Sequence, residues 1–238
     1  FSEFLKVLEI SNTSGFLAAY GTYTVFAPSN DAMQIYLSEK GLSSVDQLDA
    51  ALLKELVRFH VVEDTIYTTS FTDGKLRKAN MSGQFLVTGA ANTGIESFIR
   101  VNRQANLTKG NIVASNGIIH KIDRVLQPAT KSIAQLLEED PYYSIFVAAL
   151  KETGYFEQLN KVEKNEDGST RWYTVIAQPD SIFAKEGVAD FDALKAKLQN
   201  TPDAKDPKDS LNLFVAYRIL PDIKYIADLV TSSSHPTS

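Results

Sequence analysis

Two of the three histidines lie near acidic residues in the sequence, at spacings that could suggest a catalytic or metal site. In the segment NGIIHKIDRVLQP, residues 116–128, His120 stands three residues before Asp123. A strand places alternate side chains on opposite faces, so His120 shares a face with Ile118 and Ile122 while Asp123 lies on the other. We therefore expect no His–Asp pair. We interpret His120 as a core histidine with hydrogen-bonded ring nitrogens, and a ligand or base is the alternative.

A second cluster, HVVED, brings His60, Glu63 and Asp64 close together in sequence and could cradle a metal ion. In an extended segment His60 and Glu63 face opposite ways, so a polar exit from a helix is the preferred interpretation. The run NEDGS, residues 165–169, is acidic and contains glycine but lacks the spaced ligands and closing glutamate of an EF-hand. We expect no metal and no cofactor.

Signatures of catalysis are missing from the sequence. The third histidine is His235, and no HExxH, GxSxG, phosphate-binding or dinucleotide-binding pattern occurs. The chain has no cysteine, which excludes disulfides, thiolate chemistry and cysteine-ligated metals. The prediction is that the protein is not an enzyme. An enzyme that uses the His60 region remains a third hypothesis, which would need an acid–base pair in a deep cleft.

Composition narrows the class of protein. The formal charge of −5 gives no basic face for nucleic acid, and we interpret KLRK (residues 75–78) as a solvated hairpin end. No run approaches the roughly 20 apolar residues that cross a membrane, and no signal peptide is visible. Because the chain starts at Phe1 in mid-pattern, we expect any export signal or lipid anchor to lie upstream.

Hydrophobic periodicity predicts helices followed by strands in the first half. Helices are expected at residues 2–12, 30–40 and 44–60, the last opening with Ser44 and Gln47 at capping-box spacing. A buried strand is expected at residues 23–27. The later segments FLVTG, SFIRVN, NIVASN and GIIHKIDRVL alternate with a period of two and are separated by turn residues, which predicts a meander of strands. This order indicates an α+β domain.

The chain repeats itself once. FSEFLKVLE (1–9) matches YSIFVAALK (143–151), TYTVFAPSNDAM (22–33) matches WYTVIAQPDSIF (172–183), and ELVRFHVVEDTIY (55–67) matches NLFVAYRILPDIKY (212–225). Three blocks in one order predict two domains of one kind, residues 1–128 and 129–238. The leading helix of the first domain is expected to be partly missing, and nothing in the second corresponds to the strands of residues 75–128. We expect further chain, or another partner, to complete the second sheet.

These blocks resemble the fasciclin (FAS1) domain: YTVFAPSNDAM, then FHVV, then NGIIHKIDRVLQP. The resemblance implies two α+β domains, each a β-sandwich or wedge with packed helices. It implies a secreted or surface protein that works by adhesion, with a surface protein, matrix protein or glycan as partner. The segment EEDPYYSIFVAALKETGYF (138–156) resembles bacterial fasciclin-like surface lipoproteins. The family's Tyr-His motif falls on Phe59 and His60. Phenylalanine replaces the tyrosine, and in the second copy the pair aligns with Ala216 and Tyr217.

Two functional hypotheses follow. The first is a cell-surface or extracellular adhesion module, and the alternative is a carbohydrate-binding accessory subunit of a bacterial glycan-uptake system, in which Trp172 or exposed tyrosines would stack on sugar rings. Asn12, Asn80 and Asn106 begin glycosylation triplets. The predicted partner-binding residues are Phe59, His60, Val61, Val62, Glu63 and Asp64. The predicted structural motif is Asn116, Gly117, His120 and Asp123.

Overall fold

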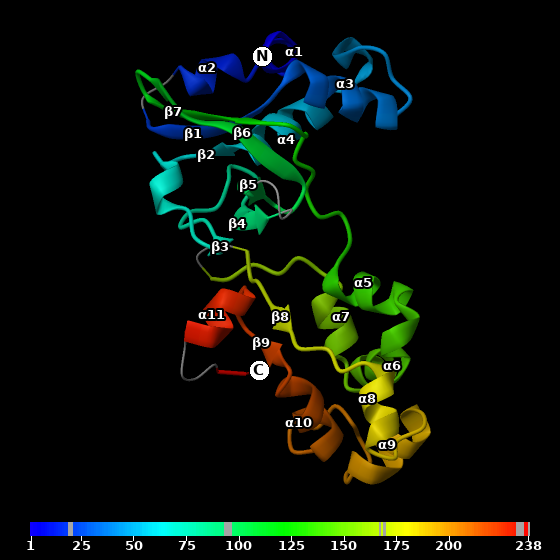
Figure 1. Ribbon diagram of the computed structural model, residues 1–238. Helices are drawn as coiled ribbons and strands as arrows, with labels where there is room; N and C mark the ends of the chain where they lie inside the picture. Colours follow the sequence, from blue (N-terminus) through cyan, green and yellow to red (C-terminus); the bar gives the residue numbers. More distant parts are fainter. Residues whose placement is uncertain (19–20, 93–96, 167, 169, 232–235, 238) are drawn as a thin grey trace. The chain divides into compact units, whose positions relative to one another are not determined.

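The computed structural model describes residues 1–18, 21–92, 97–166, 168, 170–231 and 236–237 (Figure 1). The chain divides into two compact units, residues 1–128 and 129–238. In the first unit helices precede a meander of strands, which confirms the predicted α+β class. His235 lies outside the described residues.

The described residues of the first unit contain α1 (Ser2–Ile10), α2 (Ser14–Leu17), α3 (Asn30–Glu39) and α4 (Ala50–His60). Helices α1 and α3 begin where the sequence predicts, whereas the short α2 is not among the expected helices. Ser29 accepts a hydrogen bond from Ala32 N–H and so caps α3. The Ser44–Gln47 capping box forms, but it closes a 3₁₀ turn at Val45–Gln47. Asp49 then caps α4, so the expected helix over residues 44–60 is two elements, because a second capping side chain starts a new helix.

The strands of the first unit form one mixed sheet in the order β2-β1-β7-β6-β5-β4-β3. They are β1 (Tyr23–Pro28), β2 (Val61–Val62), β3 (Gly74–Lys75), β4 (Val87–Asn92), β5 (Ser97–Val101), β6 (Ala105–Ala114) and β7 (Gly117–Ile122). β1 lies between antiparallel β2 and parallel β7. The sequence thus predicts each long strand of the meander, and β7 ends at Ile122 because Asp123 bonds back to Asn106.

Apolar side chains pack on both sides of this sheet. Figure 1 shows β4 and β5 folded over from β1, β7 and β6, so the sheet curls. Helices α1, α3 and α4 pack on the outer face, with Phe4, Met33, Leu53 and Val57 in the cluster between. Phe26, Phe59, Leu86, Val101 and Ile122 belong to the cluster of the other face. β1 is buried at nearly every position, which is the pattern of a strand covered on both faces.

The second unit is mostly helical in its described residues. Its elements are α5 (Ile133–Glu139), α6 (Ser144–Glu152), α7 (Tyr155–Leu159), β8 (Thr174–Val175), α8 (Asp180–Lys185), α9 (Phe191–Leu198), α10 (Ser210–Ala216), β9 (Ile219–Leu220) and α11 (Ile226–Thr231). A 3₁₀ turn covers Pro141–Tyr143. A core of its own contains Phe146, Leu150, Phe183, Leu211 and Ile219. β8 and β9 pair antiparallel.

A threonine fastens β1 to the chain that leaves β2. Thr24 lies opposite Val62 in the strand pair. Its hydroxyl donates to Asp64 O at 2.6 Å and accepts from Ile66 N–H at 2.9 Å. A buried hydroxyl that donates and accepts at once fixes the course of the backbone beyond the strand.

The second unit repeats this arrangement. Thr174 lies opposite Leu220. The Thr174 hydroxyl donates to Asp222 O at 2.8 Å and accepts from Lys224 N–H at 2.7 Å. The strand pair β8–β9 is therefore built like β1–β2, including its register and its bridging threonine.

Candidate functional site

The stretch Phe59–Asp64 runs from the last turn of α4 through β2. Phe59 is 1% exposed, and His60, Val61 and Val62 are fully buried. Glu63 is exposed and Asp64 is half-buried. The apolar face of α4 and both valines are needed in the core, so the predicted recognition surface is reduced to Glu63 and Asp64. A binding role for this stretch stays a prediction, restricted to those two side chains.

Both ring nitrogens of His60 are occupied. Leu126 N–H donates to Nε2 at 2.9 Å, so the proton sits on Nδ1, which donates to Leu56 O at 2.7 Å. The ring also lies 5.8 Å from the ring of Phe4, measured between centroids. Burial lowers the pKa of His60 to about 4, because the charged imidazolium would lose its hydration. His60 is a neutral core residue that joins α4 to the segment after β7.

The exposed exit from α4 carries fixed charges. Arg77 makes a bidentate pair with the Asp64 carboxylate, with Nε–Oδ2 2.6 Å and Nη2–Oδ1 2.9 Å, and Lys78 Nζ donates to Glu63 O at 2.7 Å. The hydrogen bonds from Arg77 hold the pKa of Asp64 below its usual range. Tyr67 is 46% exposed in the same segment. We call Glu63, Asp64, Tyr67, Arg77 and Lys78 the helix-exit surface.

His120 is a satisfied core histidine, as the alternation in its strand predicts. Its Nε2 donates to Ile66 O at 2.8 Å, and Nδ1 accepts from Asn111 N–H at 3.3 Å. The rings of Phe26 and Phe71 flank it at 5.3 and 5.2 Å between centroids. Burial lowers its pKa. The side chain joins β7 to the chain after β2 and to the irregular part of β6.

The other members of the predicted structural motif also hold backbone together. Asn116 Nδ2 donates to Leu17 O at 2.7 Å. A Cβ on Gly117 would lie 2.0 Å from Tyr23 O, so no other residue type fits beside β1. Asp123 accepts from Asn106 N–H at 2.7 Å and from Asn106 Nδ2 at 2.9 Å. Asp123 thus closes the β6–β7 hairpin and takes no part in the His120 contacts.

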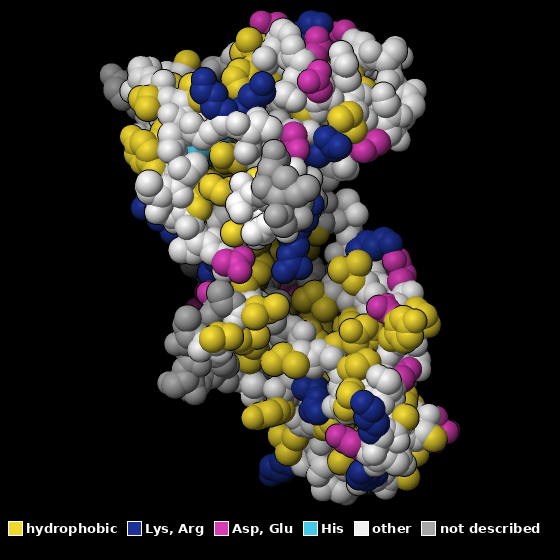
Figure 2. All heavy atoms as spheres, in the orientation of Figure 1, with side chains coloured by type: hydrophobic (Ala, Val, Ile, Leu, Met, Phe, Trp, Pro, Cys, Tyr) yellow, Lys and Arg dark blue, Asp and Glu magenta, His cyan; other side chains and the backbone are white. Residues whose placement is uncertain are grey.

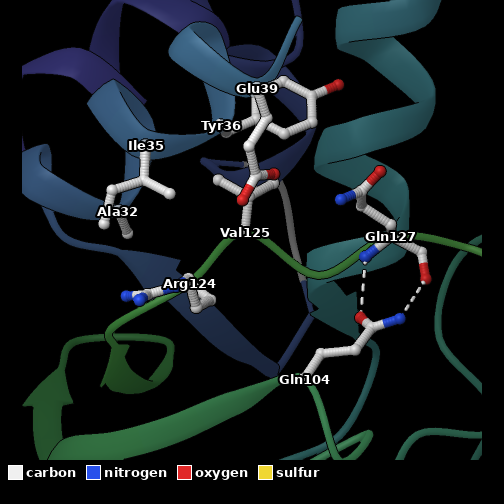
Figure 3. Close-up of a pocket in the computed structure, with 8 residues that line it drawn as sticks. All are labelled: Ala32, Ile35, Tyr36, Glu39, Gln104, Arg124, Val125 and Gln127. Carbon is white, nitrogen blue, oxygen red and sulfur yellow. Dashed lines mark hydrogen bonds between the residues drawn. The ribbon is translucent and has the colours of Figure 1, made fainter.

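A shallow polar cavity of about 250 Å³ lies between α3 and the segment after β7 (Figure 3). Tyr36 and Glu39 enter it from α3, and Arg124 and Gln127 line the opposite side. Gln104 closes one end, where its side-chain amide donates to Gln127 O at 3.0 Å and accepts from Gln127 N–H at 2.9 Å. One carboxylate and one guanidinium at a cavity of this size suit a small polar group, and its lining residues include no serine, threonine, lysine or histidine.

His60 and its acidic neighbours in sequence do not form a metal site. His60 has no free nitrogen, because both are bonded to main-chain groups, and Glu63 lies outside the core that encloses the ring. Within the described ranges no three His, Asp or Glu side chains converge as metal ligands. Across the same residues no helix combines the length and the apolar character that a membrane span requires.

The three glycosylation triplets differ in access. Asn80 is 4% exposed, and its side chain donates to Phe59 O and accepts from Ser82 N–H and Gln84 N–H. Asn106 is bonded to Asp123. Asn12 is exposed, in a left-handed turn after α1. Only Asn12 of these three presents its amide to solvent.

Trp172 lies two residues before β8, which starts at Thr174. It lines a cavity of about 440 Å³ together with Gln158, Asn165, Thr170, Arg171, Tyr173, Pro221 and Asp222. The Tyr173 hydroxyl accepts from Gln158 Nε2 at 2.8 Å and donates to Glu163 Oε2 at 3.0 Å. An aromatic ring among amide and charged groups is a composition that suits a sugar.

The structure also corrects the position that matches His60 in the second unit. Val62 pairs with Thr24, and Leu220 pairs with Thr174, so Val62 and Leu220 are equivalent. Two residues earlier in each segment, Arg218 therefore takes the place of His60. Arg218 Nη1 donates to Phe214 O at 2.8 Å, four residues back, as His60 does to Leu56 O. The expected alignment of Phe59 and His60 with Ala216 and Tyr217 is wrong by one residue, because α10 ends two residues before β9 while α4 runs directly into β2.

Sequence reasoning missed Arg77 and Lys78 as partners of the exit from α4, and it missed the exposed Tyr67 in the same segment. The charge signs give a signal, since the acidic pair at residues 63–64 is followed by basic residues at 77–78. Pairing them requires knowing that the chain folds back after β2, which local periodicity does not show.

Comparison with known proteins identifies the family of the first unit. Residues 1–128 match the Fasciclin domain. Human stabilin-1 is 34% identical over 138 residues, which cover 55% of this chain and 5% of that protein. The transforming growth factor-beta-induced protein ig-h3 of Sus scrofa is 30% identical over 165 residues, 69% of this chain and 22% of that protein.

Stabilin-2 of Rattus norvegicus is 24% identical over 229 residues, 93% of this chain and 15% of that protein. This chain matches less than a quarter of the length of each of these relatives. The alignment with stabilin-2 extends well into residues 129–238, because it covers more of the chain than the first unit contains.

Proposed function

Because this chain belongs to the fasciclin family, we propose that it is a non-enzymatic binding module that acts outside the cell or on its surface. The fasciclin resemblance supports adhesion as the kind of function. The described histidines support a role without catalysis, since His60 and His120 use their ring nitrogens to hold the backbone. A bacterial surface location with an upstream lipid anchor stays a prediction.

We propose that a surface or matrix protein binds the helix-exit surface. The observation that carries this is the pre-organised charge on an exposed segment: Arg77 is held by Asp64 and by Thr65 O, and Lys78 by Glu63 O. Side chains already fixed lose little conformational freedom on binding, and an exposed tyrosine such as Tyr67 is a common anchor in interfaces.

The test is a binding screen of the chain against immobilised matrix proteins and glycans on one slide. We expect a protein to bind, Tyr67→Ala to weaken that binding at least ten-fold, and Tyr142→Ala to leave it unchanged. Tyr142 is a matched control because it is an exposed tyrosine of the second unit, 73% exposed. Equal binding by both variants would remove the helix-exit surface from the proposal.

The alternative function, glycan binding by an accessory subunit of an uptake system, is favoured by the Trp172 cavity. Its amides, carboxylate and guanidinium lie around an aromatic ring, which suits hydroxyl groups of a neutral sugar. If glycan spots bind on the same slide, Trp172→Ala should abolish the signal and Trp172→Phe should keep part of it. Binding that survives Trp172→Ala would reject this site.

We also propose that residues 129–238 form a second fasciclin domain that is incomplete among the described residues. The support is the repeated strand pair, with Thr24 and Thr174 in the same register and with the same hydrogen bonds. A second shared contact joins the start of α8 to α6: Asp180 accepts from Ser144 and Ile145, as Asn30 accepts from Glu3 N–H at α1.

A further inference from the structure

The cavity between α3 and the segment after β7 has two walls that the core holds in place. Tyr36 and Leu37 of α3 are buried among the side chains of the outer face. In the opposite wall Val125 and Leu126 are buried, and Leu126 N–H donates to His60 Nε2 at 2.9 Å. Walls that packing already fixes lose little conformational freedom when a ligand binds between them.

Two glutamines fix one end of this cavity. The side-chain amide of Gln104 donates to Gln127 O at 3.0 Å and accepts from Gln127 N–H at 2.9 Å (Figure 3). The side-chain amide of Gln127 also belongs to the lining, and it makes no hydrogen bond to another described residue. Its donors and its acceptor are therefore available to a ligand.

Two opposite charges line the same cavity without pairing. Glu39 lies on α3 and Arg124 on the segment after β7, and in Figure 3 the Glu39 carboxylate points from the helix toward that segment. Both side chains are exposed, and neither belongs to an ion pair among the described residues. Arg124 Nη1 donates to Asp123 O at 2.8 Å, which is a neutral acceptor. A molecule that carries both charges can bind both groups at once.

The rest of the lining is apolar and the space is small. Ala32 is fully buried, Val125 is 5% exposed and Ile35 is half-buried. The volume of about 250 Å³ falls below the range of roughly 300–1,000 Å³ in which drug-sized ligands bind. The cavity therefore suits a small molecule with one apolar part and two charged groups.

The surface around α3 also favours a small polar ligand. Figure 2 shows acidic and basic side chains interspersed in the region of α3 on the visible face of the first unit, with few hydrophobic ones between them. Protein interfaces centre on apolar and aromatic side chains, so this region fits a small molecule better than a protein.

We propose that this cavity binds a free α-amino acid with an apolar side chain. Its ammonium group donates to Glu39, its carboxylate accepts from Arg124, and its side chain contacts Val125. Both polar contacts are charge-assisted, and a guanidinium can bind both oxygens of a carboxylate. The cavity shares no residue with the helix-exit surface, so the inference is independent of the adhesion proposal.

The test is a titration of the isotope-labelled 238-residue chain with L-valine, followed by NMR at the side-chain amides of the two glutamines. Two blocked relatives of valine serve as matched ligands, since N-acetylvaline lacks the ammonium group and valinamide lacks the carboxylate. Glu39→Gln and Arg124→Gln remove the charges from the cavity. Glu9→Gln and Arg100→Gln are the matched controls, because both residues are exposed and neither lines the cavity.

We expect valine to shift both amide signals and to bind more tightly than either blocked relative by a factor of about ten, since each loses one charge-assisted contact. In Glu39→Gln, valine and N-acetylvaline should bind equally, because the partner of the ammonium group is gone. In Arg124→Gln, valine and valinamide should bind equally for the corresponding reason. The two control variants should bind valine as the unaltered chain does.

Three results would overturn the inference. The site is rejected if the two amide signals do not move with valine up to about 10 mM, which covers dissociation constants in the millimolar range. Equal binding of valine and its blocked relatives to the unaltered chain rejects a zwitterionic ligand. Tighter binding of glutamate than of valine rejects the apolar side chain. Each of these results leaves the adhesion proposal unaffected.

Discussion

The Nε2 atom of His60 accepts a hydrogen bond from the main-chain N–H of Leu126 at 2.9 Å, which joins the end of α4 to the segment after β7. These residues lie far apart in sequence. The ring is fully buried and its Nδ1 donates to Leu56 O. This geometry gives His60 a role in stability, in contrast to the surface role that its neighbourhood in sequence suggests.

Replacing His60 by alanine should destabilise the first unit by about 2–4 kcal/mol, because it leaves a cavity and two buried main-chain groups without partners. The free energy of unfolding in urea measures this. Glu63→Ala is the control, since Glu63 is exposed, and it should change stability by less than about 0.5 kcal/mol. A His60→Ala variant with full stability and lost binding would restore the surface interpretation.

Acid should weaken the fold through the same side chain. Burial lowers the pKa of His60 from 6.5 to about 4, so the unfolded chain binds a proton at a pH where the folded chain does not. Stability from His60 is therefore full above about pH 6.5, falls as the pH drops below it, and levels off near pH 4, with a total loss of about 3 kcal/mol. His120 acts in the same direction, because burial lowers its pKa too.

The measurement is the urea midpoint at several pH values between 7 and 4. The slope of stability against pH over this window should be smaller in His60→Gln than in the unaltered chain. An unchanged slope would show that other groups cause the acid sensitivity.

Replacing His120 by alanine should also cost stability, by about 2–3 kcal/mol, since Ile66 O and Asn111 N–H lose their partner inside the sheet. Thermal unfolding followed by circular dichroism tests this. Lys121→Ala is the matched control, because it is the next residue of β7 and points to the opposite face. Equal melting temperatures for the two variants would contradict a structural role for His120.

A methyl group at Gly117 should disrupt the junction of β1 and β7. The Cβ would lie 2.0 Å from Tyr23 O, so Gly117→Ala is expected to cost about 3 kcal/mol or more. Gly15→Ala is the control, since nothing lies within 4 Å of a Cβ there. Soluble yield and the urea midpoint of both variants give the comparison, and a stable Gly117→Ala variant would show that the two strands can separate slightly.

Hydrophobic periodicity and helix capping depend on residues that are close in sequence, and the elements that could be predicted rest on them. The Ser44–Gln47 capping box, the alternation that buries His120, and the turn-bounded strands of the meander are all readable from neighbouring residues. Asp49 divides the expected helix because two caps compete within six residues, which a period alone does not resolve.

Contacts between distant segments could not be predicted. The burial of Phe59 and His60 depends on Leu126 and on the curl of the sheet, and the pairing of Asp64 with Arg77 depends on the return of the chain after β2. The match of Arg218 to His60 becomes visible only when the strands are paired, because α10 ends two residues before β9 whereas α4 runs directly into β2.

The most direct test of the account is the affinity of the chain for the protein found in the screen, measured by biolayer interferometry with two charge variants. Asp64→Lys reverses the charge beside Arg77 on the helix-exit surface, and Glu9→Lys makes the same charge reversal at an exposed position of α1. We predict that Asp64→Lys weakens binding at least ten-fold while Glu9→Lys leaves it unchanged, with both variants folded. Equal affinity of the two variants, or binding of glycans alone, would contradict the account.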